Sequence, residues 1–185
     1  AEAMLTREEE KIWELVEELS IDMENFSVLF YPKLFHNLKA AIKEVCTDDR
    51  ERHIYYEDVE IPGSVMLEIV KEKRFGELPE NMRQAAEEAY ESLLHTKDGQ
   101  LCDVIIDRAT LEAIYQDGKQ AKVDIIRDNA EATVAVADIK IAVRSQKTAK
   151  SMDFMKRAMV ECDSIQVDQL AKAALNGTDA IREYL

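Results

Sequence analysis

The sequence predicts an all-α protein made of two similar helical lobes. Apolar residues recur at helical spacing through most of the chain. Only 5 Gly and 3 Pro occur among 185 residues, which leaves little material for tight turns. Helix-start and helix-stop residues divide the chain at intervals typical of helices. We expect one continuous all-α unit, with a first lobe over residues 1–99 and a second over residues 100–185.

The N-terminal part of the chain is expected to hold two helices. Thr6 and Glu9 form a capping box before an apolar stripe, which predicts a helix over residues 7–19. Apolar residues continue at helical spacing over residues 23–45. Pro32 lies inside that stretch and lacks a backbone donor, so a kink or a fresh helix start is expected there.

The middle of the chain begins with a charged loop over residues 46–52. Residues 53–56 and 59–61 have a faint strand pattern, but the Pro62-Gly63 pair at their end favours an extended connector. Ser64 and Pro79 then start helices, and Asp98-Gly99 and Asp117-Gly118 are expected to separate the next ones. The helices are expected over residues 64–72, 79–95, 101–116 and 119–144.

The C-terminal part is expected to hold shorter helices. Residues 145–150 are polar and predict a hinge, after which Ser151 opens a helix to about residue 161. A further helix over residues 166–175 stops at Asn176-Gly177, a favourable C-terminal cap. Thr178 then starts a last short turn.

An internal repeat links two of these helices. Residues 37–43 align with residues 138–144, and each copy has a short amide or carboxylate, an aliphatic residue, a Lys and a second cation. The later segments 64–67 and 78–82 roughly parallel 151–154 and 165–169. A repeat favours an interaction scaffold over a catalyst, because duplicated surfaces build large concave faces. The polar positions of the repeat are Asn37, Lys39, Lys43, Asp138, Lys140 and Arg144.

Four segments together resemble the C-subunit family of V/A-type ATPases, whose equivalent in eukaryotic V-ATPases is the d subunit. Residues 30–43 resemble the family's Tyr-Asp-x-x-Asn-Leu-Lys helix, and residues 135–144 its Asp-Leu-x-Asn-Ile-Lys-x-x-x-Arg helix. Residues 78–83 and 103–109 are similar to its Leu-Pro and Asp-x-x-Leu-Asp-Arg stretches. The chain departs from the pattern at Pro32, where the family usually has Asp. It is expected to cover the central to C-terminal part of the family, without the first and last segments.

The resemblance implies a non-catalytic adaptor. Family members form a funnel of three similar lobes around a pseudo-threefold axis, and this chain has material for about two. The wide mouth would receive the central-stalk subunits and the other end would rest on the membrane rotor ring, on the cytoplasmic side, so that torque for proton or sodium transport passes through it. The six repeat residues would then line the inner face that meets the stalk. ATP and ion binding belong to other parts of the complex, so no cofactor or small-molecule substrate is implied.

Charge and composition exclude several other classes of protein. The formal net charge of -14 repels nucleic-acid phosphates and anionic lipid. No apolar run is long enough to insert into a membrane. Cys46, Cys102 and Cys162 are far apart and lack metal-ligand spacing, so reduced buried thiols are expected.

Catalytic and metal-binding patterns are weak. Glu91 and His95 have the spacing of half a metal site, but no second pair joins them. Asp103 and Asp107 stack one turn apart, and acid–base work by them would need an enclosing pocket. The sequence has no phosphate-binding loop and no Ser-His-Asp set. Two alternatives stay open: a generic helical interaction scaffold, and a helical-bundle metalloenzyme, which would need Glu and His clustered in its core.

Overall fold

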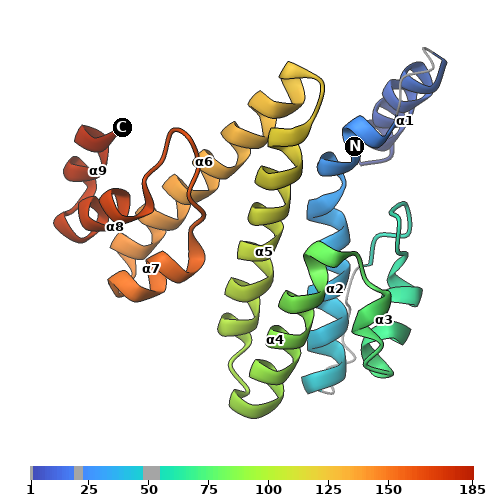
Figure 1. Ribbon diagram of the computed structural model, residues 1–185, viewed down its shortest axis with the longest axis horizontal. Helices are drawn as coiled ribbons and strands as arrows, with labels where there is room; N and C mark the ends of the chain where they lie inside the picture. The colour runs from blue at the N-terminus through green and yellow to red at the C-terminus, as the bar shows by residue number, and fades with distance from the viewer. Residues whose placement is uncertain (1, 19–22, 48–54) are drawn as a thin grey trace.

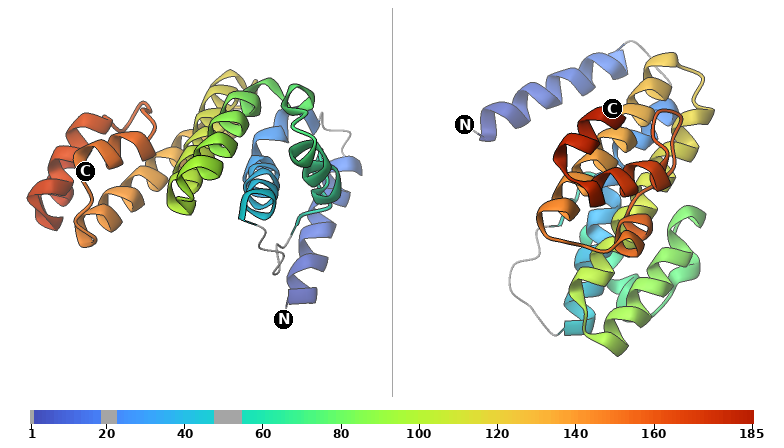
Figure 2. Two further views of the ribbon diagram at one scale, coloured as in Figure 1. Left: turned by 90° about the horizontal axis from the view of Figure 1, so that it is seen from below. Right: turned by 90° about the vertical axis from the view of Figure 1, so that its left-hand side faces the viewer.

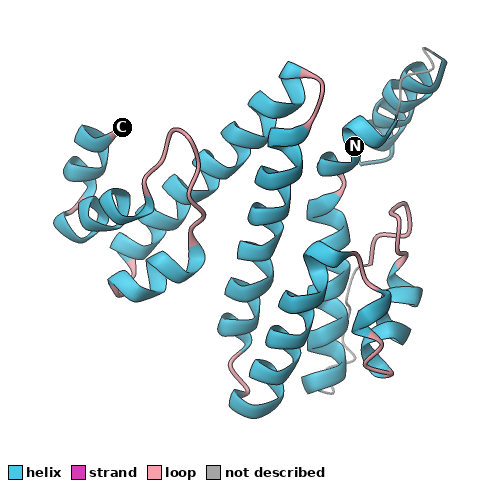
Figure 3. Ribbon diagram, viewed as in Figure 1, coloured by secondary structure: helices cyan, strands magenta, loops and turns pink. Residues whose placement is uncertain are grey.

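The computed structural model describes residues 2–18, 23–47 and 55–185, and these residues contain helices and no strand, which confirms the all-α class (Figures 1 and 3). Here η denotes a 3₁₀ helix. The elements in chain order are α1 Glu2–Glu18, η1 Met23–Leu29, α2 Tyr31–Thr47, α3 Gly63–Lys71, η2 Phe75–Glu77, α4 Glu80–Thr96, α5 Gly99–Gln120, α6 Asp124–Lys147, α7 Met152–Ala158, α8 Val167–Asn176 and α9 Thr178–Tyr184.

The helices form two groups joined by the α5–α6 hairpin. Helices α2, α4 and α5 lie side by side, with α3 on the flank of α2 (Figure 1). Helix α6 packs against α5 and carries α7, α8 and α9. The view from below separates the two groups clearly (Figure 2). Because α5 contacts helices of both groups, it sets their relative position.

Two clusters of buried apolar side chains fill these groups. The first cluster runs from Leu34 to Ala113 and the second from Ile114 to Ile181. They meet within α5, and Tyr31 packs against both. Since α5 contributes to both clusters, a division of the chain at residue 99 stays a prediction.

Several helix boundaries lie where the sequence predicts them. The Asp98 side chain caps α5 by accepting hydrogen bonds from two first-turn N–H groups at 2.9 and 3.1 Å. The Ser151 hydroxyl caps α7 in the same way at 3.2 Å. Helix α2 begins at Tyr31, so Pro32 lies in its first turn and the expected fresh start is confirmed. Gly177 follows α8 with a φ of 114°, a conformation that favours glycine.

The break expected at Asp117-Gly118 is wrong. Helix α5 continues through Gly118 to Gln120. Gly118 is buried, and a Cβ atom built there would lie 2.2 Å from the Cβ atom of Ala130 on α6. This glycine therefore permits close helix packing, as glycine does wherever backbones approach each other.

Other expected boundaries also differ. Residues 145–147 continue α6 and do not form a hinge, because Ser145 is buried on the same side as Asp138 and Ala142. Ser64 lies inside α3 and makes no capping hydrogen bond; Pro62 occupies the cap position. Helix α7 ends at Ala158, earlier than expected.

The connector before α3 is irregular, as expected. Over residues 55–62 it contains no strand, and the Gly63 N–H donates to the Tyr56 carbonyl at 3.2 Å. His53 and Ile54 lie outside the described residues. A membrane-crossing helix, which must be both long and apolar, is not found in the described part of the chain.

Candidate functional site

A groove runs along the surface where α2, α5 and α6 meet and continues toward α7. It consists of two hollows of about 360 and 410 Å³ that share Asp107, Ile141 and Arg144. We refer to it as the α5–α6 groove. Its apolar lining includes Val104, Leu111, Ile114, Ala137, Ile141 and Phe154, and its polar lining includes His36, Lys39, Asp103, Asp107, Lys140, Arg144 and Lys150.

Two lysines of α2 pair with two aspartates of α5 at this groove. Lys39 Nζ lies 2.6 Å from Asp107 Oδ1, and Lys43 Nζ lies 2.6 Å from Asp103 Oδ1. Both pairs are one helical turn apart on their own helices, so the two rows match. Ion pairs that water still reaches contribute about 1 kcal/mol or less each. The two ion pairs align α2 with α5. They also neutralise part of the charge of Lys39 and Lys43 within the chain.

Lys140 and Arg144 have a different environment. Both are exposed on α6, one turn apart, and both line the groove. Neither side chain pairs with a carboxylate anywhere in the described ranges. They are therefore available to a partner. Together with Lys39 and Lys150, they give the groove a cationic rim on a chain whose net charge is -14.

Two of the six repeat residues expected on the inner, stalk-facing surface, Asn37 and Asp138, are fully buried. The Asn37 amide donates to the carbonyls of Tyr56 at 2.7 Å and Ile61 at 3.2 Å, and it accepts from the Tyr56 N–H at 2.9 Å. Asp138 accepts from the Val160 N–H at 3.2 Å. Both side chains hold a loop against their helix and do not reach the groove surface.

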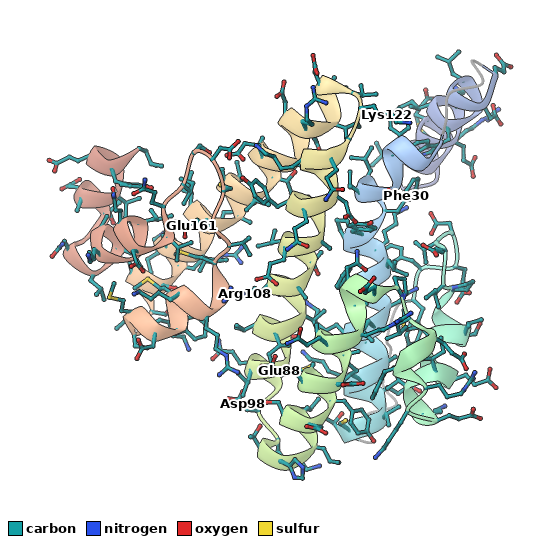
Figure 4. The ribbon with its side chains drawn as sticks, viewed as in Figure 1. Phe30, Glu88, Asp98, Arg108, Lys122 and Glu161 are labelled. Atoms are coloured by element: carbon teal, nitrogen blue, oxygen red, sulfur yellow. The ribbon has the colours of Figure 1, made fainter. Side chains whose placement is uncertain are left out.

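On the opposite side of α5, charged groups link α7 to both α5 and α4. Arg108 donates to Glu112 at 2.8 Å and to the Lys156 carbonyl at 3.3 Å, near the C-terminal end of α7. Arg157 of α7 pairs with Glu88 of α4 at 3.2 Å. Figure 4 shows Glu88 and Arg108 on the side of α4 and α5 that faces α7. These contacts tie the two groups of helices together behind the groove.

The remaining chemistry-bearing residues do not converge. Glu91 and His95 are exposed on α4, and the described part of the chain has no group of three or more His, Cys, Asp or Glu side chains arranged for a metal ion. Cys46, Cys102 and Cys162 are buried free thiols. Burial raises the pKa of Cys102 to about 11, so this thiol stays protonated.

Sequence reasoning did not identify the apolar floor of the groove or Lys150. Lys150 donates to Gln100 at 2.9 Å and its ammonium lies 4.9 Å from the centre of the Phe154 ring. The apolar floor and Lys150 belong to a surface that exists only when α5, α6 and α7 pack together. No spacing within one helix could have indicated it.

One comparison with known proteins gives a match. The sequence model of the family described as the ATP synthase (C/AC39) subunit matches residues 1–185. No curated protein and no solved structure matches the chain.

Proposed function

The chain belongs to the ATP synthase (C/AC39) subunit family of V/A-type rotary ATPases, and from this we propose that it is the non-catalytic adaptor between the central stalk and the membrane rotor ring. In this role it transmits torque for ATP-coupled proton or sodium transport and lies on the cytoplasmic side, peripheral to the membrane. The family match is the observation that carries the proposal. The pseudo-threefold funnel implied by the family stays a prediction.

The helix arrangement supports a torque-transmitting role. Torque passes only through a part that resists bending, and long packed helices provide such stiffness. Helices α5 and α6 have 22 and 24 residues and pack against each other. On the side of α5 opposite the groove, the pair Glu88–Arg157 and the contacts of Arg108 join the two groups of helices. A load applied to one group would reach the other with little loss.

We assign stalk binding to the α5–α6 groove. A cationic rim around an apolar floor fits a helical partner that carries an apolar stripe and flanking acidic residues. Lys140 and Arg144 would contact that partner directly. Lys39 and Lys43 are paired with Asp107 and Asp103, so their charge would add less to the attraction. Asn37 and Asp138 would act indirectly, by holding loops against α2 and α6.

Reversing the charge of the groove is expected to weaken stalk binding. In the double variant K140E/R144E, two cations that would attract an acidic partner become anions, so affinity for the purified stalk subunits of the same ATPase should fall about tenfold or more. The loss should shrink as salt is raised, because salt screens exposed charges. Biolayer interferometry at low and high salt measures both effects.

Lys122 supplies the matched control, because it is exposed on the turn between α5 and α6, outside the groove (Figure 4). K122E should bind the stalk as the wild-type chain does, and all variants should melt within about 2 °C of it, since exposed charges affect stability little. Equal affinity of K140E/R144E and K122E would remove the groove from the stalk interface. A wild-type chain that binds neither stalk nor isolated rotor ring would instead favour a generic helical scaffold.

A further inference from the structure

Asp138 is a buried carboxyl group with one unused oxygen. It lies on α6 with no exposed surface. Its Oδ1 accepts from the Val160 N–H at 3.2 Å, while its Oδ2 is buried and has no hydrogen-bond partner among the described residues. A buried polar atom without a partner is uncommon and requires an explanation.

Asn37 occupies the corresponding place on α2 and shows what the site requires. Its Oδ1 accepts from the Tyr56 N–H, as Asp138 Oδ1 does from Val160. Its Nδ2 donates to carbonyls of the same loop, those of Tyr56 and Ile61. At this site, one terminal atom of the side chain therefore accepts a hydrogen bond from the loop and the other donates to the loop.

The loops at the two sites have the same register. Ile61 follows Tyr56 at the same spacing as Ile165 follows Val160, and α3 and α8 begin at the same offset after these isoleucines. The carbonyl groups at Val160 and Ile165 thus correspond to the two acceptors of the Asn37 amide. An ionised carboxylate offers such carbonyls only lone pairs, whereas a protonated carboxyl group offers an O–H donor.

The electrostatic environment favours the protonated form. Burial raises the pKa of Asp138 to about 7; the Val160 N–H opposes the shift, the charge of Glu161 adds to it, and Arg108 opposes it. Glu161 in the loop and Arg108 on α5 are the charged groups that act on the carboxyl. The buried residues of α7 and α8 on this side are apolar. Arg108 is itself engaged with Glu112 and the carbonyls at the end of α7.

We propose that Asp138 is a proton-binding site that carries its proton on Oδ2 and thereby holds the loop over residues 159–166 against α6. In this form it does what the Asn37 amide does for the loop before α3. Loss of the proton at alkaline pH places a negative charge beside the loop carbonyls and loosens the loop. Residue 138 is therefore a pH-sensitive latch for the second group of helices.

The proposal fixes the direction of the pH dependence. Below about pH 4 the carboxyl is protonated in both the folded and the unfolded chain, so it contributes no difference. Between about pH 4 and pH 7 only the unfolded chain is ionised, so unfolding releases a proton and stability falls as pH rises, with the unfolding constant growing about tenfold per pH unit. Above about pH 7 both forms are ionised and the penalty stays constant.

Urea unfolding of the wild-type chain and of Asp138→Asn between pH 5 and pH 8 tests this. The amide keeps the acceptor and supplies a permanent donor, so the ratio of wild-type to D138N unfolding constants should rise about a hundredfold from pH 5 to pH 7 and then level off. The control is Asp153→Asn on α7, an exposed aspartate, whose pH dependence should follow that of the wild type. A ratio for D138N that stays constant with pH would overturn the proposal.

Two measurements on folded protein test the proton and the loop directly. The carboxyl carbon of Asp138, followed by ¹³C NMR, should titrate near pH 7, and a signal already ionised at pH 5 would overturn the proposal. Amide exchange at Val160, corrected for intrinsic rates, should lose protection above pH 8 in the wild type and keep it in D138N. Unchanged protection in both would reject the latch.

Discussion

Replacing Asn37 by alanine is expected to lower the free energy of unfolding by about 3 kcal/mol. The change leaves the partly buried Tyr56 N–H and Ile61 carbonyl without their partner, while the Tyr56 carbonyl keeps its bond from the Gly63 N–H. Each such orphaned group costs about 1–3 kcal/mol. Urea unfolding at pH 7 measures the loss, and thermal melting should show a fall of about 6–12 °C.

Asn81→Ala is the matched control. Asn81 is exposed on α4 and its hydrogen bond to Asp117 is long, at 3.4 Å, so its removal should change stability by less than about 0.5 kcal/mol. Asn37→Asp should also destabilise, and more strongly at pH 8 than at pH 5, because an ionised carboxylate cannot donate to the loop carbonyls. If N37A were as stable as N81A, Asn37 would not be the residue that holds the loop.

The burial of Asn37 could have been predicted from its position in the sequence, although its polar side chain suggested an exposed residue. Asn37 lies three residues after Leu34 and four before Ala41, both of which are buried, so it falls within the apolar stripe. Asp138 falls in the same way between Val134 and Ala142 on α6. A polar residue in an apolar stripe must find its partners inside the protein. Which loop supplies those partners depends on tertiary structure, and no local pattern indicates it.

The charged rows on α2 and α5 were easier to predict. Lys39 and Lys43 have the spacing that places them on one face of α2, and Asp103 and Asp107 have the same spacing on α5. Their pairing needs α2 and α5 to lie side by side, which depends on the shared apolar core. The groove itself requires the position of α6 as well. Helix content and most caps are local properties, and the site is not.

Gly118 shows the same limit of prediction from sequence. A glycine in a helical stretch can either end the helix or let a second helix approach closely. Gly118→Val is expected to destabilise the chain by at least about 2 kcal/mol, or roughly 4–8 °C in melting temperature. Valine would place a Cβ atom 2.2 Å from the Ala130 Cβ atom, so α5 and α6 would have to move apart. That penalty exceeds the gain in helix propensity over glycine, which is below about 1 kcal/mol.

Gly99→Ala on the same helix is the control, since a Cβ atom at Gly99 meets no atom within 4 Å; that variant should be as stable as the wild type or slightly more so. A second comparison isolates the contact. Gly118→Ala should be destabilised, and adding Ala130→Gly should restore part of the loss, because the two Cβ positions compete for one space. If the double variant lost at least as much stability as the two single variants together, the contact between Gly118 and Ala130 would not be the cause. Recovery would establish that this small pair sets the distance between α5 and α6, and with it the width of the groove between them.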